Sequence, residues 1–510
     1  MAQEGVKDAK KAKDRTREPE GLRGGAPRPE GPPDAPGAPA YRPLPRVEGF
    51  PGLSLLERRA RGRAARSHAP LSAHAAWAPP PGRPGAVALL EDQSRMREPD
   101  LVPIRYGRMA ASAFAFYRGS ATIMASDLSG TPTGGLRAQL CGDAHLMNFG
   151  VFRTPERALI FDVNDFDETL PGPWEWDVKR LIVSFEVAGR DLALGASERR
   201  TLALRAGAAY RRAMAEFAEQ SNLEVWYARF DADRYLADVR ARKSPDRKPV
   251  EKIARKALRK DHLGAFDNLC ERRDGRLCLK AEPPLLVPVA ALLDEEERLR
   301  YVTVMREFLA KYRESLPPER RVLIDNYRYV DMARKVVGVG SVGTRCWVVL
   351  LTGRDEADPL FIQLKWAGRS VLEPYAGASA YRQCGRRVVE GQRLMQAASD
   401  PLLGWYRLRA LDGRRHNFYA RQLWDGKASV DLSTLSTEGL GRYAEVCGWT
   451  LARGHAVSGD RVAMAAYLGG DDEFDEALAA FAIAYADTNE EDHAALQLAI
   501  EQGRVHAVDG

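Results

Sequence analysis

The sequence has few of the features that mark membrane, secreted or zinc-binding proteins. Its 6 cysteines, in 510 residues, form no Cys-x-x-Cys pair, and their spacing suits neither a zinc site nor a compact disulfide framework. The longest apolar stretch, near residues 477–486, is too short to span a bilayer, and the first residues lack the apolar core of a signal peptide. We therefore expect a cytoplasmic protein with reduced thiols and no membrane partner.

Neither sign of charge dominates the chain. The formal net charge is +6, from 76 Lys and Arg against 70 Asp and Glu, and much of the excess lies in the first hundred residues. We therefore expect no specific nucleic-acid partner. An apolar content of 45% is enough for a sizeable core, and the length allows two or three domains. The sequence does not indicate an oligomeric state.

Composition and periodicity divide the chain into a tail and a globular part. Residues 1–85 are rich in Pro, Gly, Ala, Arg and Glu with almost no apolar periodicity, which predicts a disordered tail. Residues 86–325 are mainly helical in pattern, with a short hairpin near residues 149–161. Residues 326–430 have the pattern of strands, and residues 431–510 are again helical. These patterns together predict an α+β protein.

The first candidate site is an acidic loop followed by the hairpin. The loop has the sequence Cys141-Gly-Asp-Ala-His-Leu-Met-Asn148, and Asp162 and Asp165 follow near the end of the hairpin. Carboxylate and amide oxygens that converge in this way suit Mg²⁺, which takes one or two carboxylates together with substrate phosphates. The alternative interpretation is a cluster of Asp and Asn residues that form turns and cap helices.

The second candidate is Gly338-Val-Gly-Ser-Val-Gly343, a G-x-G-x-x-G run that occurs in dinucleotide folds and in kinases. A dinucleotide fold needs a helix after the glycines, whereas residues 344–351 have the β-branched and apolar character of a strand. A strand, a glycine loop and a second strand predict a lid over nucleotide phosphates. Its expected phosphate-binding residues are Gly338, Gly340, Ser341 and Gly343.

The third candidate is Lys365, at the end of a predicted strand and about 22 residues beyond the glycine run. A strand lysine can neutralise nucleotide phosphates if an acidic residue on a neighbouring helix orients it. Glu390, in a helical segment, is the expected partner, and Glu373 is the alternative. Taken alone, Lys365 is better explained as a surface lysine on a strand.

Several of these segments together resemble one bacterial family, catalogued as domain of unknown function 2252. The matching segments are Arg118-Gly119 and residues 141–150, 162–169, 171–180, 338–344 and 421–427. The resemblance covers nearly everything after about residue 90. It implies membership of that family without explaining what the protein does.

A more distant resemblance is to aminoglycoside phosphotransferase and choline-kinase-like enzymes of the protein-kinase-like fold. Their catalytic loop, His-Gly-Asp followed by four residues and Asn, is similar to residues 141–148, although Cys141 stands in place of the histidine. By this resemblance Asp143 orients or deprotonates the acceptor hydroxyl. Asn148 and Asp162 would hold the metal, with Asp165 close enough to take that role.

The same resemblance implies a two-lobe fold with ATP and Mg²⁺ as cofactors. Asp177, at a helix start, is the counterpart of the residue that stabilises the catalytic loop in those enzymes. There the glycine loop and the lysine precede the catalytic loop, whereas here they follow it by about 190 residues. The implied fold is therefore circularly permuted, with a helical large lobe, then a β-rich small lobe, then C-terminal helices that return to the large lobe.

We therefore expect a phosphotransferase or nucleotidyl-transferring enzyme that acts on an unknown small-molecule or protein acceptor, with Asp143, His145 and Lys365 as catalytic residues. One alternative is a pseudokinase that binds nucleotide and regulates a partner. Another is an acyl transferase or hydrolase in which Cys141 is the nucleophile, His145 is the base and Asp162 or Asp165 orients it.

Two further features have plain structural interpretations. Trp174 and Trp176 follow a Pro-Gly-Pro turn, where tryptophans usually pack a loop against the core. His455 is expected to be a satisfied histidine near a helix end, although it could replace the histidine missing from the catalytic loop.

Overall fold

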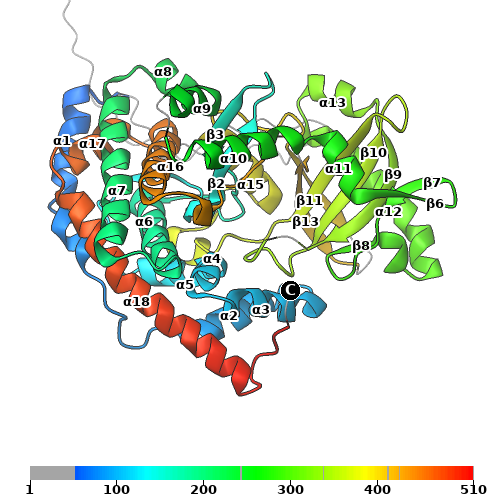
Figure 1. Cartoon of the computed structure of the whole chain (residues 1–510), viewed down its shortest axis with the longest axis horizontal. Coiled ribbons are helices and arrows are strands. Elements are labelled where there is room, and N and C mark those ends of the chain that lie inside the picture. The colour runs from blue at the N-terminus through cyan, green and yellow to red at the C-terminus, as the bar shows by residue number, and fades with distance from the viewer. Residues whose placement is uncertain (1–51, 242–243, 337, 410–412, 424–425, 509–510) are drawn as a thin grey trace, which may run out of the picture. The chain divides into compact units, whose positions relative to one another are not determined.

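The computed structural model describes residues 52–241, 244–336, 338–409, 413–423 and 426–508. The chain divides into two units, Met1–Arg42 and Pro43–Gly510, and everything below concerns the second. This unit combines many helices with four antiparallel sheets, as Figure 1 shows. The predicted α+β class is confirmed.

The described chain begins with a helix inside the segment that composition assigned to a tail. Helix α1, Leu55–Ala65, starts with a capping box between Ser54 and Glu57 and packs on α17, Arg461–Leu468. The two helices are in close contact at Gly62, where an added Cβ would lie only 2.0 Å from the Ala463 carbonyl oxygen. The prediction of a tail up to residue 85 is therefore wrong from residue 52 onward. Residues 1–51 lie outside the described residues.

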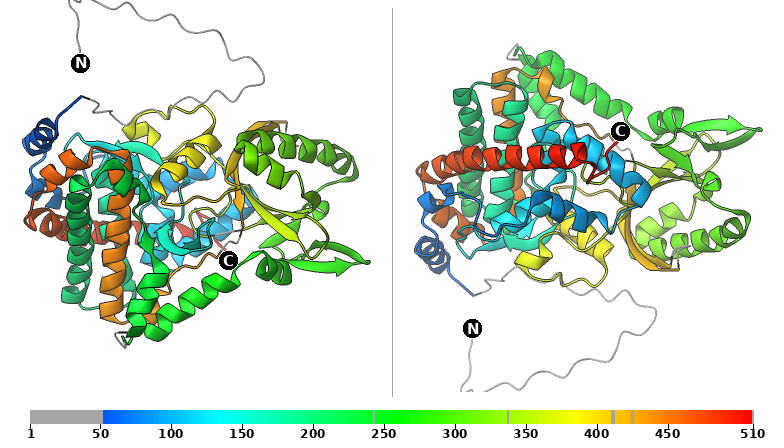
Figure 2. Two further views of the ribbon diagram at one scale, coloured as in Figure 1. Left: turned by 90° about the horizontal axis from the view of Figure 1, so that it is seen from above. Right: turned by 90° about the horizontal axis from the view of Figure 1, so that it is seen from below.

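A helical bundle surrounds α6, Trp174–Asp191, in which nearly every residue is buried. Helices from both ends of the globular sequence pack around it, namely α4, α7, α16 and α18. Figure 2 shows the long α18 lying across this group. The bundle and its neighbours are α2 (Ala86–Ser94), α3 (Val102–Ala110), α4 (Ala113–Gly119), α5 (Ala121–Leu128), α7 (Ala196–Glu219), α16 (Thr437–Ser458) and α18 (Glu473–Glu501).

Two small sheets lie on either side of the acidic loop, residues 141–148, in sequence. Strand β1, Arg137–Leu140, pairs with β4, Leu170–Pro173, and β2, Phe149–Arg153, pairs with β3, Leu159–Val163. The short strand β5, Phe230–Asp231, extends the second sheet. The predicted hairpin is confirmed, and residues 141–148 and 164–169 emerge at the ends of its strands.

A six-stranded antiparallel sheet lies in sequence between the earlier bundle helices and α16. Its spatial order is β12 (Gly404–Arg409), β13 (Arg415–Gln422), β11 (Pro359–Trp366), β10 (Cys346–Thr352), β9 (Arg328–Lys335) and β8 (Leu286–Pro288). The glycine run joins β9 to β10, which are neighbouring strands, so the predicted strand, glycine loop and strand are confirmed. Because β8 belongs to this sheet, the sheet draws on residues before the predicted boundary at 326. The described part of β9 ends at Lys335, and Val337, expected in that strand, lies outside the described residues.

Helices cover both faces of this sheet. One face packs on α12, Glu295–Ser315, through Phe308 and Tyr312, and α15, Cys384–Met395, contacts β12 and β13. On the other face α11, His262–Leu269, and the β6–β7 hairpin bury Val348 and Leu350. The remaining elements are α8 (Asn222–Tyr227), α9 (Ala232–Ala241), α10 (Arg247–Arg259), α13 (Pro318–Ile324), α14 (Glu373–Ala376), β6 (Cys270–Arg273) and β7 (Arg276–Leu279).

Among the residues that the structure describes, none of the helices is both long enough and apolar enough to cross a membrane.

Arg83 ties the start of the globular chain to its last helix, which yields a test of the fold. Its guanidinium lies 2.7 Å from Asp127 on α5 and 2.6 Å from Asp492 on α18. We expect Arg83→Gln to lower the free energy of unfolding by about 3 kcal/mol or more, because two largely buried carboxylates lose their counter-ion. Arg95→Gln, which removes the exposed pair with Asp92, should change it by less than about 0.5 kcal/mol. Equal losses in urea denaturation would contradict this account.

Candidate active site

Asp177 fixes the acidic loop through its backbone. The Asp177 carboxylate accepts hydrogen bonds from Cys141 N at 2.7 Å and Gly142 N at 3.0 Å. Gly142 has a φ of +84°, and a Cβ there would lie 2.4 Å from the Glu168 carbonyl oxygen, so only glycine fits. The role expected for Asp177, stabilising the loop, is therefore seen in these contacts.

A buried histidine supports Asp177 in turn. His455 Nε2 lies 3.3 Å from Asp177 Oδ2, and the Tyr210 hydroxyl lies 2.8 Å from His455 Nδ1. His455 thus acts on the loop through Asp177 and does not reach it directly. Trp174 stacks on Tyr210, and both Trp174 and Trp176 are buried, which agrees with the packing interpretation of the two tryptophans.

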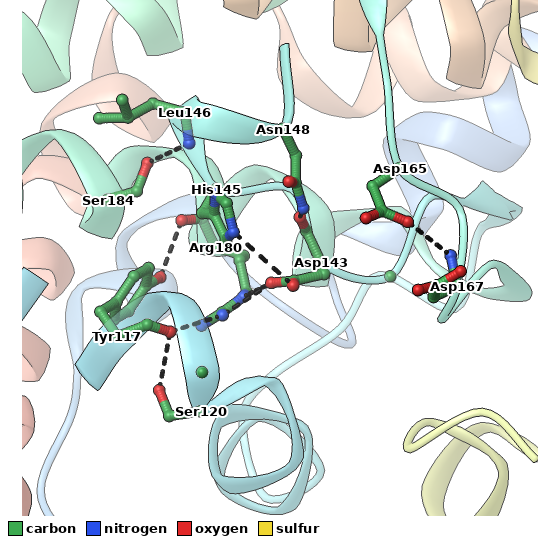
Figure 3. Close-up of polar contacts among 12 residues, drawn as sticks. Tyr117, Ser120, Asp143, His145, Leu146, Asn148, Asp165, Asp167, Arg180 and Ser184 are labelled. Carbon is green, nitrogen blue, oxygen red and sulfur yellow. Dashed lines mark hydrogen bonds and ion pairs between the residues drawn. The ribbon is translucent and has the colours of Figure 1, made fainter. Parts of the chain in front are cut away.

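The Asp143 carboxylate has one anchored oxygen. Arg180 Nε and Nη2 both lie 2.7 Å from Asp143 Oδ1, whereas Oδ2 faces His145 Nε2 at 3.8 Å. Asn148 Nδ2 donates to the Asp143 carbonyl oxygen at 2.8 Å, which brings the two predicted site residues together. Figure 3 shows Asp143, His145, Asn148 and Arg180 in this arrangement, with Asp165 beside them.

His145 is buried next to these groups. Removal from water lowers the pKa of His145 to about 4, and Arg180 and Arg118 add to this effect against the attraction of Asp143. The imidazole is therefore neutral near pH 7 and carries one N–H, which can be donated to the Asp143 carboxylate. Its catalytic role stays a prediction.

Cys141 does not have the surroundings of a nucleophile. Its side chain is fully buried, and burial together with the negative charge of Asp177 raises the pKa of the thiol well above its usual range. A reactive cysteine needs an accessible thiolate in an electropositive setting. The contacts therefore offer no support for a hydrolase or acyl transferase built on Cys141.

Lys365 contacts residues at the end of the β2–β3 hairpin, which lie about 200 residues earlier in the sequence. Its Nζ lies 2.5 Å from Asp167 Oδ2 and 3.6 Å from Asp165 Oδ2, and the Tyr419 hydroxyl donates to Asp167 Oδ1 at 2.6 Å. Removal from water lowers the pKa of Lys365, but Asp165 and Asp167 outweigh it and hold this pKa well above its usual range. Lys365 is therefore a permanent positive charge at this point.

The expectation that Glu390 or Glu373 orients Lys365 is wrong. Glu390 lies 3.4 Å from Arg386, and Glu373 accepts from the backbone N of Ser370 at 3.2 Å. Helix α15 reaches the hairpin end with Arg387 instead. The Arg387 guanidinium donates to the carbonyl oxygens of Thr169 and Asp167, both at 2.7 Å. The carboxylates that pair with Lys365 are Asp165 and Asp167, at the end of the hairpin.

Asp162 does not join the other acidic groups. It lies inside β3, where its two oxygens accept from Val163 N and Ala397 N, each at 2.8 Å. Burial raises the pKa of the Asp162 carboxyl to about 6, although Arg453 and these N–H groups oppose the shift. The prediction of Asp162 as a metal ligand is therefore not supported. Asp165 is better placed because it lies beyond the strand end, next to Lys365.

The glycine run lies against helices α3 and α4. Gly338 O accepts from Arg108 at 2.6 Å, and Gly343 O accepts from Glu98 N at 2.7 Å. A Cβ at Gly340 would lie 3.2 Å from the Arg118 carbonyl oxygen. Arg118 is in turn close enough to Asp143 for that carboxylate to influence its pKa. The run that contains the predicted residues Gly338, Gly340, Ser341 and Gly343 thus reaches α4 at Arg118, a residue whose charge faces Asp143.

The site contains functional candidates that sequence reasoning did not select. They are Arg97, Arg118, Asp167, Arg180, Arg387, Arg421 and Lys427. Several lie inside the segments that resemble the bacterial family, and this position was the one sequence feature that could have indicated them. Because they are far apart in sequence, the sequence did not show which of them lie close together in the fold.

Metal binding by the protein alone is limited. Among the described residues, no group of three or more His, Cys, Asp or Glu side chains is arranged to hold a metal ion. Mg²⁺ is usually bound by one or two carboxylates together with substrate phosphates. Asp165 and Asn148 fit that donor set.

Comparison with known proteins identifies the bacterial family that the sequence segments resemble. The model of a family described as uncharacterized proteins conserved in bacteria, domain of unknown function 2252, matches residues 97–499. The chain therefore belongs to this family. No curated protein and no solved structure matches it.

The Asp177 contacts predict a specific effect on the loop. Asp177→Ala leaves two buried backbone N–H groups without an acceptor, so we expect a loss of about 2 to 4 kcal/mol of unfolding free energy. Hydrogen exchange of the Cys141 and Gly142 amides should accelerate more than that of other loop amides. Asp191→Ala, at the exposed end of the same helix, is the control. Unchanged protection of the two amides would contradict the anchoring role.

The raised pKa of Asp162 predicts a pH dependence. Because the folded carboxyl has a pKa of about 6 against 3.8 for an ordinary aspartate, the folded state binds the proton more readily. Its contribution to stability is present below about pH 4 and is lost as the pH rises through 6. Asp162→Asn should therefore gain up to about 3 kcal/mol relative to the native chain between pH 4 and pH 8. Urea denaturation across this range, with Asp191→Asn as control, checks it, and a constant difference would contradict it.

Proposed function

We propose that this protein is an ATP- and Mg²⁺-dependent phosphotransferase with a circularly permuted, kinase-like arrangement of two lobes. The observation that carries the proposal is the meeting of Lys365 with Asp165 and Asp167 beside the Asp143 loop. Strand lysine, metal-binding aspartate and catalytic loop are the parts that kinases assemble around a nucleotide. Their convergence from distant segments is hard to explain by packing alone, because it places several ionic groups at low exposure.

The glycine run supplies the second support. It connects β9 to β10, and β11, which pairs with β10, carries Lys365, so the predicted lid and the lysine lie on one sheet. In this proposal Gly338, Gly340, Ser341 and Gly343 cover the nucleotide phosphates with backbone N–H groups. Lys365 neutralises phosphate charge from the sheet side.

The acidic groups divide the remaining roles. Asp165, in the sequence Asp165-Phe166-Asp167, and Asn148 would hold Mg²⁺, which supplies charge neutralisation for the transferred phosphoryl group. Asp143 orients the acceptor hydroxyl and accepts its proton through Oδ2, since Oδ1 is held by Arg180. His145 keeps this carboxylate in place as a neutral imidazole.

A nucleotide-binding pseudokinase is the second candidate, and one observation favours it. Arg180 occupies Asp143 Oδ1 with two donors, which leaves this carboxylate only Oδ2 for an acceptor hydroxyl. In that case the same residues would bind nucleotide and regulate a partner.

Nucleotide binding is the direct test of the proposal. ATP with Mg²⁺ at 100 times its dissociation constant should stabilise the native chain by about 2.7 kcal/mol, measured as a thermal shift. Lys365→Met and Asp165→Asn should abolish this shift, whereas the exposed control Lys311→Met should keep it. The absence of any nucleotide-induced shift with Mg²⁺ would contradict the proposal.

Turnover separates the two candidates. Asp143→Asn should retain the nucleotide-induced shift but lose about 100-fold or more of ADP release across a panel of hydroxyl-bearing acceptors. Nucleotide binding by the native chain without turnover on any acceptor would favour the pseudokinase.

A further inference from the structure

Two cations beside the proposed metal site lack carboxylate partners. Arg421 lies on β13 opposite Gln363 of β11, two residues from the pair formed by Lys365 and Tyr419, and Lys427 follows β13. Within the described parts of the chain, no Asp or Glu oxygen lies within 4.0 Å of either cation, whereas Lys365 already has Asp165 and Asp167. Asp165, the acidic group that faces these two cations, is therefore already paired with Lys365.

Hydrogen bonds hold the Arg421 side chain and the backbone on either side of Lys427. Arg421 donates to Gln363 Oε1 at 3.0 Å and to the Asn164 carbonyl oxygen at 3.3 Å, one residue before Asp165. Around Lys427, Gly426 N donates to Lys260 O at 2.7 Å, and Ala428 exchanges two backbone hydrogen bonds with Val151 on the hairpin. These contacts fix the chain on either side of Lys427 and leave its ammonium group to interact with a ligand.

The charges around Lys427 are mostly of its own sign. Removal from water lowers the pKa of Lys427 to about 7, and the repulsion of Arg421 is the next largest cause. Lys365 and Lys260 act in the same direction, and only Asp165 opposes them. A half-buried lysine among cations destabilises the ligand-free fold, which is a common property of binding sites.

Helix α10 brings further positive charge toward this cluster. It ends at Arg259, with Lys260 as its C-cap, and in Figure 1 it runs across the molecule from the β2–β3 hairpin toward α11. Its exposed cations are Arg247, Lys248, Lys252, Arg255, Lys256 and Arg259, and Glu251 is the one acidic residue among residues 247–259. A surface of one sign raises the local concentration of oppositely charged ligands.

We propose that Arg421 and Lys427, beside Lys260, form an anion-binding subsite that holds a phosphate group on the acceptor. The assignment to the acceptor rests on the proposed function, in which the glycine loop and Lys365 serve the nucleotide. A planar guanidinium and an ammonium group converge well on the oxygens of a phosphate. The acceptor is accordingly a phosphorylated molecule whose hydroxyl reaches Asp143.

The experiment measures binding of inorganic phosphate to the full chain by thermal shift, with chloride at matched ionic strength as the reference and citrate as the carboxylate probe. Lys427→Gln and Arg421→Gln should each weaken phosphate binding roughly tenfold or more. Lys311→Gln, an exposed lysine on α12 outside this cluster, should leave it unchanged. Citrate should bind more weakly than phosphate, and stronger binding of citrate would overturn the choice of phosphate.

The ligand-free proteins provide a second readout. Lys427→Gln should melt at the same or a higher temperature than the native chain, because it removes an unpaired charge. A lysine with only a structural role would give a lower melting temperature, and that result together with unchanged phosphate binding would overturn the proposal.

The nucleotide arm separates this inference from the proposed function. Lys427→Gln should keep the thermal shift produced by ATP with Mg²⁺ while losing the shift produced by phosphate. Loss of both in equal measure would assign the two cations to the nucleotide and overturn the acceptor subsite. Phosphate binding in a native chain that shows no nucleotide binding would contradict the proposed function and leave the anion site established.

Discussion

The contact between Lys365 and the hairpin carboxylates joins the two parts of the candidate site. Lys365 comes from the centre of the six-stranded sheet, and Asp165 and Asp167 come from the end of the hairpin that the helical bundle supports. An ion pair at such low exposure is costly unless its partners are close and well oriented. Its presence fixes which face of the sheet meets the acidic loop, and therefore where the glycine run lies.

A second constraint acts on the loop itself. The Asp177 carboxylate accepts from the backbone N–H groups of Cys141 and Gly142. His455 on α16 contacts Asp177, and Tyr210 on α7 contacts His455. The loop is therefore positioned by helices from both ends of the globular sequence. The expected histidine is missing at Cys141, and a histidine from a different helix interacts with the same anchoring aspartate.

Much of this arrangement could be predicted from local pattern. The hairpin, the strands on both sides of the glycine run and the α+β class follow from alternation and turn residues, which act over a few positions. The tail boundary failed because composition outweighed a capping box at Ser54 and Glu57, and because α1 is stabilised by α17, more than 390 residues later. Asp162 was chosen over Asp165 because β3 extends two residues further than expected, which places Asp162 inside the strand. The partner of Lys365 and the cations Arg421 and Lys427 depend on tertiary contacts that no local pattern contains.

The most direct measurement is a structure of the full chain with a non-hydrolysable ATP analogue and Mg²⁺. The account predicts that the phosphates lie between residues 338–343 and Lys365, with the metal on Asp165 and Asn148 and the terminal phosphate facing Asp143. A nucleotide bound elsewhere, or a metal held without Asp165, would contradict it.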